Sequence, residues 1–527
     1  MRVGLLAAAV AVVLTAGVTL VVADSLGSAA EATTLVPADA AIVVHARLDP
    51  SLGQKRALAQ LLQKLPERAQ QQVRQGIPNA VNGLLGEAGI DYAEDVEPWL
   101  GDEVALFLTG DLSAPDGAVL LQTSDAEAAL AAVGQALAAE GADPQQESSY
   151  RDVTIWAVPV EPPAAEVDVT EMGYAVIGDF VAIGTPDGLT AAVDAHRDGG
   201  IVADDDYRRM VDPLTDDRLL TYWVDAPQIV QSAVEDIDEA QVFAESAFAF
   251  APQQESAGAV FATAESVVFE TVTRKPDDGP GFLPSESSVT LMGSLPAEAW
   301  VSAVIPAIGR NVVEILDEIP ESADLEEVFS SSTGLDLRDD VLSWMQDGAL
   351  FVSGEDVTEL GGALVIESSD PAATTRTLDE VFRPGRGLDA SVQPTQVGGM
   401  AGFELVDPAA PAHVVVLGGE RLIVAVDGGK VNDEDSSAAR LTGDGPTLAD
   451  SEQFGRAVAS LGGDYTPVFF LDVAGATQLI RSAFGASSLP TEFAEAQTYL
   501  EQVSHVVAGV RDDGQLISQR VVIGTAP

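Results

Sequence analysis

The sequence predicts an α+β fold made of two tandem homologous lobes, each a mainly antiparallel sheet with packed helices, after an N-terminal transmembrane helix. Three observations lead to this prediction. A sequence block in the first half recurs in the second, paired strand-like runs are separated by helical runs in both halves, and the chain begins with an unbroken apolar run. A chain of 527 residues is also too long for a single hydrophobic core.

The first element is the apolar run from Val3 to Ala23, VGLLAAAVAVVLTAGVTLVVA. As a helix it would span roughly 30 Å, the thickness of a bilayer core. Arg2 precedes the run and the acidic Asp24 follows it, so the positive-inside rule places the N-terminus in the cytoplasm and the rest of the chain outside. Residues 1–23 are therefore interpreted as a signal-anchor or a cleaved signal peptide. The protein is then held on the cell membrane by a single pass, or is secreted if the segment is cleaved.

The remaining chain divides into four parts. Residues 24–34 are small and polar, and predict a tether. A first α+β repeat covers residues 35–274. The acidic segment KPDDGPGFLPSES, residues 275–287, is rich in proline and glycine, as linkers between domains are. A second α+β repeat covers residues 288–525 and ends in a hairpin.

The elements of the first repeat follow from turn and capping signals. Gly178-Asp179 suits a tight hairpin, and Thr185-Pro186 begins a helix with proline in its favoured first position. The predicted strands are 41–48, 103–109, 118–123, 154–160, 174–177, 180–184, 219–224, 259–264 and 267–274. The predicted helices are 52–85, broken near Ile77-Pro78, then 126–139, with Ser124 or Asp125 as N-cap, and 186–196.

The repeat itself is clearest between residues 89–110, GIDYAEDVEPWLGDEVALFLTG, and residues 334–354, GLDLRDDVLSWMQDGALFVSG. Allowing one single-residue gap after Asp102, the two segments match residue by residue, including a tryptophan in a chain that has only 5. A period of this length indicates tandem domains rather than a solenoid. The matched residues include Asp91 with Asp336, Trp99 with Trp344, and Asp102 with Asp347.

The charge balance is extreme, with 26 basic and 83 acidic residues and a net charge of −57. A field of this sign repels nucleic acid phosphates and anionic lipid headgroups, so we exclude nucleic acid as a partner. The acids are interpreted as hydrated surface groups, with loose cation binding as the alternative. The chain has no cysteine, which excludes disulfides, thiolate metal sites and cysteine nucleophiles.

Several of these motifs together resemble a known family. They are the opening LVPADAAIVVHARLDPS from Leu35, the block D-V-x-P-W-L-G-D-E-V-A around Trp99, and the hairpin YAVIGDFVAIGT from Tyr174. The sequence resembles the bacterial family catalogued as domain of unknown function 3352, over nearly the whole chain after Thr33. The resemblance implies an N-terminal hydrophobic segment and a large extracytoplasmic part. It implies no reaction and no catalytic residue.

Residue types that are catalytic or metal-binding in other proteins do not form recognisable motifs in this sequence. His45, His196, His413 and His505 stand alone, without HExxH or a second histidine at metal spacing, and are interpreted as structural. No GxSxG, SxxK or glycine-rich phosphate loop occurs, although a scattered serine triad stays open. We therefore predict no catalytic, cofactor-binding or metal residue and no cofactor.

The acidic motifs have two interpretations each. The spaced pairs Asp91/Glu94 and Asp336/Asp339 resemble capping boxes, with a catalytic carboxylate pair as the alternative. The runs 204–206 and 433–435 are interpreted as solvated loops, or else as weak sites for a hard cation. Trp99 and Trp344 are predicted core anchors, and the glycine pairs 418–419 and 428–429 are predicted turns.

These observations favour a non-enzymatic binding or scaffold module of the cell envelope, anchored by its N-terminal helix. Its ligand would be a protein or a lipid. A carrier of lipid or of another small apolar molecule is the first alternative, and a hydrolase with dispersed carboxylates is the second.

Overall fold

The computed structural model describes residues 31–67, 70, 92–110, 115–139, 146–159, 171–229, 254–275, 283–319, 322–383, 392–405, 413–428, 436–484, 497 and 499–526. The predicted signal or anchor at 1–23, and the tether up to residue 30, lie outside them. Within the described part, no helix has the length and apolar character needed to cross a membrane. The fold is a mixture of helices and antiparallel sheet, so the predicted α+β class is confirmed.

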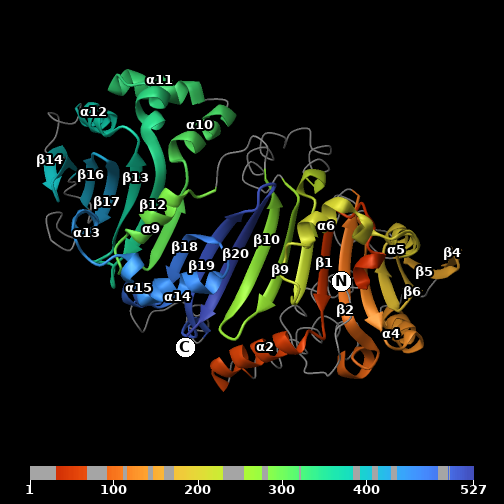
Figure 1. Ribbon diagram of the computed structural model, residues 1–527. Coiled ribbons are helices and arrows are strands. Elements are labelled where there is room, and N and C mark those ends of the chain that lie inside the picture. Colours follow the sequence, from red (N-terminus) through yellow and green to blue (C-terminus); the bar gives the residue numbers. More distant parts are fainter. Residues whose placement is uncertain are drawn as a thin grey trace. The chain divides into compact units, whose positions relative to one another are not determined.

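The chain divides into two compact units, Met1–Pro276 with Asp513–Ser518, and Asp277–Asp512 with Gln519–Pro527. In the first unit, the strands pair antiparallel in the order β4-β5-β6-β7-β3-β2-β1-β8-β9-β10 (Figure 1). Their bounds are β1 Ile42–Arg47, β2 Leu100–Thr109, β3 Asp116–Thr123, β4 Gln146–Tyr150, β5 Val153–Pro159, β6 Glu171–Ile177, β7 Phe180–Gly184, β8 Leu220–Val224, β9 Ser256–Ala262 and β10 Ser266–Arg274.

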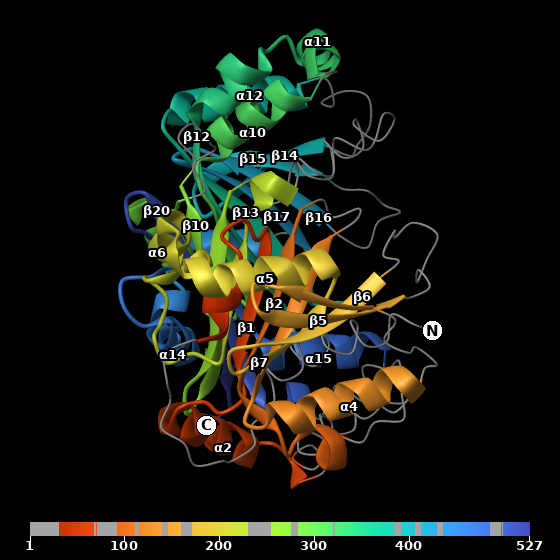
Figure 2. The same cartoon turned by 90° about the vertical axis from the view of Figure 1, so that its right-hand side faces the viewer.

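Helices cover both faces of this sheet, because its strands alternate buried apolar side chains between two cores. In β2, Ala105 and Phe107 belong to the core beneath α5 and α6, whereas Val104 and Leu106 belong to the core beneath α4 (Figure 2). The helical elements are η1 Ala32–Leu35, α2 Leu52–Lys64, η2 Tyr92–Val96, α4 Ala126–Ala139, α5 Pro186–Asp198, η3 Ile201–Ala203 and α6 Asp205–Val211.

In the second unit, the strands pair antiparallel in the order β14-β15-β16-β17-β13-β12-β11-β18-β19. Strand β20 pairs with β19 and completes this order, and its residues up to Ser518 are counted with the first unit. The strand order is therefore the same as in the first unit. The bounds are β11 Val301–Ile305, β12 Met345–Ser353, β13 Gly361–Ser368, β14 Val392–Val397, β15 Met400–Leu405, β16 His413–Gly418, β17 Arg421–Asp427, β18 Thr466–Asp472, β19 Val503–Asp512 and β20 Leu516–Thr525.

Helix α12 packs on this sheet through Ala373 and Leu378, in a core that includes Trp344 and Phe403. In Figure 1, α10, α11 and α12 lie together in green and teal. The helical elements are α9 Glu286–Gly293, α10 Ile308–Glu318, α11 Ser322–Thr333, η4 Leu337–Val341, η5 Leu342–Trp344, α12 Pro371–Phe382, α13 Ser437–Thr442, η6 Leu448–Asp450, α14 Glu452–Leu461 and α15 Val473–Phe484.

Corresponding hydrogen bonds also occur within each of the two units. The Trp99 indole N–H donates to the Asp95 carbonyl at 2.5 Å, and the Trp344 indole N–H donates to the Asp340 carbonyl at 3.0 Å. Both tryptophans are buried, as predicted for core anchors. Two further pairs of backbone bonds correspond. Ser124 N–H donates to Trp99 C=O in the first unit, as Ser369 N–H donates to Trp344 C=O in the second. Ile201 N–H donates to Val36 C=O in the first unit, as Leu448 N–H donates to Leu295 C=O in the second.

A β-bulge follows each of these tryptophans. The register of β2 against β3 shifts between Leu100 and Val104, and the register of β12 against β13 shifts between Met345 and Gly348. The first bulge therefore holds one residue more than the second. Beyond both bulges the strands return to regular pairing, so the extra residue changes no position further along the strand.

The position of this extra residue corrects the sequence alignment. Ala105 and Ala349 occupy equivalent positions after the bulges, so Glu103 corresponds to Asp347. The prediction that Asp102 matches Asp347 is wrong, because Glu103 and Asp347 are the buried residues directly before the regular pairing, whereas Asp102 and Gln346 are exposed. Two buried acids are thereby placed at one structural position.

Candidate functional site

The second unit contains an open cavity of about 660 Å³. It lies where β12, β17 and β18 end and β11 begins. Its lining residues are Glu298, Trp300, Gly354, Glu355, Thr358, Glu359, Asp427, Gly428, Ser436, Arg440, Asp472, Ala474, Gly475 and Gln478. The cavity thus gathers side chains from segments far apart in the sequence.

Two of its carboxylates are held at strand ends by hydrogen bonds to the helices that follow. Asp427 ends β17 and accepts bonds from the Ser437 N–H at 3.0 Å and the Ser437 hydroxyl at 2.6 Å. Asp472 ends β18 and accepts a bond from the Ala474 N–H at 3.0 Å, at the start of α15. Such bonds hold the two carboxylates in place in the lining of the cavity.

Side-chain contacts hold two further acids. Arg440 lies 2.6 Å from Glu298 in an ion pair, and the Gln478 amide donates to Glu355 at 3.2 Å. Glu355 and the fifth acid, Glu359, are exposed to solvent.

The apolar part of the lining is the Trp300 side chain. Trp300 precedes β11, and its backbone bonds to both flanking strands. A Cβ atom added at Gly475 would lie 2.6 Å from the Trp300 Cβ, so only glycine lets α15 approach this closely.

Five carboxylates and a single guanidinium give the lining a formal net charge of −4. A concave surface with one sign of charge concentrates counter-ions, and carboxylates accept hydrogen bonds from ammonium groups. The arrangement is chemically suited to a small organic cation.

Comparison with known proteins decides the family. A family model described as "Protein of unknown function (DUF3352)" matches residues 2–511. The chain belongs to the DUF3352 family. The resemblance drawn from the sequence motifs is therefore confirmed.

The similar solved structures give no further information about the family. Those described as crystal forms III, I and IV of TP0453 share 13%, 6% and 14% identity with the DUF3352 chain, with TM-scores of 0.25, 0.25 and 0.23. They cover 46%, 48% and 45% of this chain, and 83%, 82% and 94% of their own chains. At these TM-scores the similarity carries no argument. No curated protein matches the sequence.

The four histidines of the DUF3352 protein lie on four different elements. His45 is buried in β1, His413 begins β16, His505 is buried in β19, and His196 is exposed in the last turn of α5. Among the described residues, no group of three or more histidine, aspartate or glutamate side chains is placed to hold a metal ion.

His505 has contacts that the sequence did not indicate. Its Nδ1 lies 2.8 Å from the Ser504 hydroxyl and its Nε2 lies 3.3 Å from the Ser460 hydroxyl. Burial, and then the charge of Arg456, lower the pKa of His505. A serine hydrolase has a carboxylate on the nitrogen away from its nucleophile, whereas both nitrogens here meet serines.

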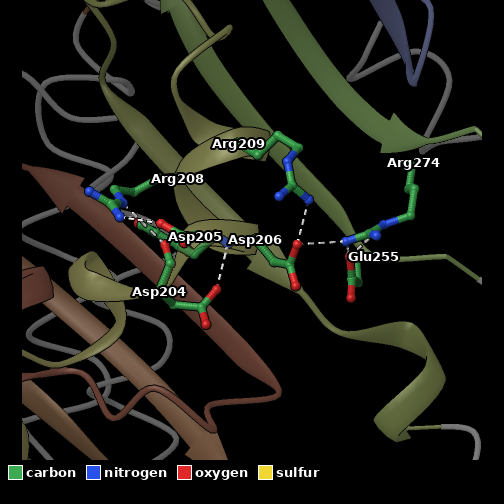
Figure 3. A network of polar contacts seen from close by, with 8 residues as sticks. Asp204, Asp205, Asp206, Arg208, Arg209, Glu255 and Arg274 are labelled. Carbon is green, nitrogen blue, oxygen red and sulfur yellow. Dashed lines mark hydrogen bonds and ion pairs between the residues drawn. The ribbon is translucent and has the colours of Figure 1, made fainter.

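The acidic run 204–206 is not the predicted loop, and that prediction is wrong. Asp204 caps α6 by accepting from the Tyr207 N–H at 2.8 Å, and the next two acids lie in the first turn of the helix. Figure 3 shows Asp205 paired with Arg208, and Asp206 reaching both Arg209 and Arg274. Aspartates are favourable at a helix N-terminus, which explains why they begin a helix here.

In this cluster, arginine side chains pair with the acids where a metal cation had been the alternative interpretation. Arg274 bridges Asp206 at 3.1 Å and Glu255 at 2.5 Å (Figure 3). The hydrogen bond from Arg274, and then that from Arg209, hold the pKa of Asp206 below its usual value. The other predicted acidic run, 433–435, lies outside the described residues.

The spaced acids of the repeat form a cap in a different way from the prediction. The Asp336 side chain accepts from the Arg338 N–H at 2.9 Å and the Asp339 N–H at 2.8 Å. The carboxylate that reaches back to the Asp336 N–H is Asp340 and not Asp339, because the turn is a π-helix with a wider spacing. In the first unit Asp91 lies outside the described residues, and Glu94 lies in η2.

The equivalent acids Glu103 and Asp347 were missed by the sequence reasoning. Asp347 accepts from the Ser285, Ser287 and Ser288 hydroxyls, and from the Ala307 N–H at 2.8 Å. Burial alone raises the pKa of Asp347, but these hydrogen bonds outweigh it and the pKa is lowered.

Glu103 has the corresponding role in the first unit. It accepts a bond from the Ala32 N–H at 3.0 Å and lies 3.6 Å from the His45 imidazole. Burial favours its neutral form, yet His45, the Ala32 N–H and Arg47 together lower its pKa. Each buried acid therefore fastens the first segment of its own unit, which is a structural task.

Proposed function

We propose that this protein is a membrane-anchored, extracytoplasmic binding module that is not an enzyme, and that it binds a small organic cation in the cavity of the second unit. The observation that carries the proposal is the lining of five carboxylates and one arginine. Such a lining favours a polar cation over the apolar cargo of a lipid carrier.

The same proposal includes the architecture. We infer two tandem homologous lobes, residues 35–274 and 288–525, joined by the linker 275–287. The shared strand order and the paired tryptophan hydrogen bonds support this duplication. Residues 1–23 would anchor the protein, and residues 24–34 would tether it as far as η1, where Ala32 already packs in the core of the first unit.

A titration with putrescine, a small diamine, tests the cavity. Wild-type protein is expected to bind putrescine in isothermal titration calorimetry, and the double variant Glu355→Gln/Glu359→Gln to bind it at least about tenfold more weakly, because two carboxylates are lost from the lining. Glu420→Gln is the matched control, since Glu420 is an exposed acid of the same unit outside the lining. Equal affinities for the three proteins would contradict the site, and binding of the neutral butanediol would contradict the charge argument.

Native mass spectrometry of protein released gently from its own membrane fraction tests the anchor and the ligand class. The expected result is an intact chain, including residues 1–23, with a small cationic molecule attached. A bound lipid would support a carrier instead, and a mass without residues 1–23 would show a secreted protein.

A further inference from the structure

Helix α11 has no hydrophobic core of its own. None of the residues Ser322–Thr333 is buried, and Leu325 and Val328 are 57% and 66% exposed. A helix of this length is marginally stable in water without tertiary packing. The exposed Leu325 and Val328 side chains are therefore available to a partner.

Ion pairs and the partly buried Phe329 connect α11 to its unit. Arg338 of η4 contacts Glu326 of α11 at 2.8 Å and Asp317 of α10 at 2.6 Å. The Arg338–Glu326 pair is partly buried and Asp317 is exposed, and ion pairs this close to the surface contribute little to stability. They orient the helix while leaving its other side uncovered, because Glu326 points to η4.

The uncovered side has a defined chemistry. Leu325 and Val328 stand three residues apart, so they share one face of the helix. Asp324 and Glu327, which are exposed, border that face. Ile315 of α10 and Ile319, which follows that helix, are 45% and 40% exposed. We call Leu325, Val328, Asp324 and Glu327 the α11 face.

We propose that the α11 face docks an amphipathic helix of a partner protein, whose apolar side is bordered by lysine or arginine. The apolar pair would be buried against the partner, and the acids would meet the basic border. A second copy of this chain is disfavoured, since each copy carries a net charge of −57. An anionic lipid surface is disfavoured for the same reason.

A synthetic helical peptide of leucine and lysine, with the lysines on one face, serves as the probe. Fluorescence anisotropy at about 0.15 M salt measures its binding to the full chain. The variant Leu325→Ser/Val328→Ser is expected to bind at least about tenfold more weakly than wild type. Val357→Ser is the matched control, because Val357 is 52% exposed in the same unit. Circular dichroism of each variant checks that the fold is kept.

The outcomes separate the proposal from general charge attraction. Equal binding by wild type and the Leu325→Ser/Val328→Ser variant would overturn it, because the peptide would then be held by the acidic surface at large. Binding of neutral phosphatidylcholine vesicles that is lost in this variant, without peptide binding, would also overturn it in favour of a membrane contact. Neither result depends on the amine cavity.

Discussion

Asp347 is 9% exposed and accepts hydrogen bonds from the side chains that begin its unit. A further bond, from the backbone N–H of Ala307, fixes a residue with φ of 44°, a conformation that residues other than glycine rarely adopt. The carboxylate thus offsets a local backbone strain as well as its own burial.

We predict that Asp347→Asn lowers the free energy of unfolding by about 2 kcal/mol, because hydrogen bonds to a buried charge are replaced by bonds to a neutral amide. Urea unfolding measures this change. Asp339→Asn is the matched control, since Asp339 is exposed, and is expected to change stability by less than about 0.5 kcal/mol.

We also predict that Asp347→Asn changes how the free energy of unfolding depends on pH. The pKa of Asp347 is lower in the folded state than in the unfolded state, so its contribution is complete above the unfolded pKa of about 3.9 and is lost as the pH falls through the folded value. Unfolding free energies measured downward from pH 5 should therefore fall more steeply for wild type than for Asp347→Asn. Parallel curves would contradict the assignment.

At the scale of elements, turn chemistry determined what the sequence could predict. The hairpin at Gly178-Asp179 was predicted correctly because glycine signals a tight turn. In the structure Gly178 has the positive φ of 59° that such a turn requires. Strand β4 was missed because its turn to β5 is made by Arg151 and Asp152, with φ of 46° and 67°, and neither residue signals a turn of this type strongly. Aspartates in the first turn of α6 were likewise mistaken for a loop.

Because α15 approaches Trp300 closely, we predict that alanine destabilises the protein at Gly475 but not at Gly455. Gly475→Ala should lower the free energy of unfolding by about 1–3 kcal/mol, because the new methyl group collides with the tryptophan. Gly455→Ala in α14 is the matched control. No atom lies within 4 Å of the added Cβ there, so a gain of up to about 1 kcal/mol is expected. Thermal unfolding of both variants measures the contrast, and equal losses would contradict the packing argument.

At the scale of the whole molecule, the sequence predicted the α+β class, but it did not predict the cavity. Its acids lie before β11, after β12 and at the ends of β17 and β18, and no local pattern links Glu298 with Asp472. The buried acid Glu103 was hidden for a related reason. A one-residue difference inside a bulge moved the apparent match onto its neighbour, and only the strand register corrects it.

The net charge of −57 predicts that salt stabilises the protein. The Debye length falls from about 10 Å at 0.1 M to about 3 Å at 1 M, so repulsion among the surface acids is screened. The midpoint of thermal unfolding should rise steadily with sodium chloride over this range. Sucrose, which is uncharged, is the control for general solvent effects, and an unchanged midpoint in salt would show that the acids are already neutralised by pairing.

The bulge after Trp99 has a consequence for how these units tolerate changes in length. One residue more or fewer at this place is absorbed locally, and every later side chain of the strand keeps its side of the sheet. An insertion elsewhere in the strand would exchange the two sides. The bulge is therefore a site where a residue can be gained or lost, provided that the buried acid Glu103 keeps its place.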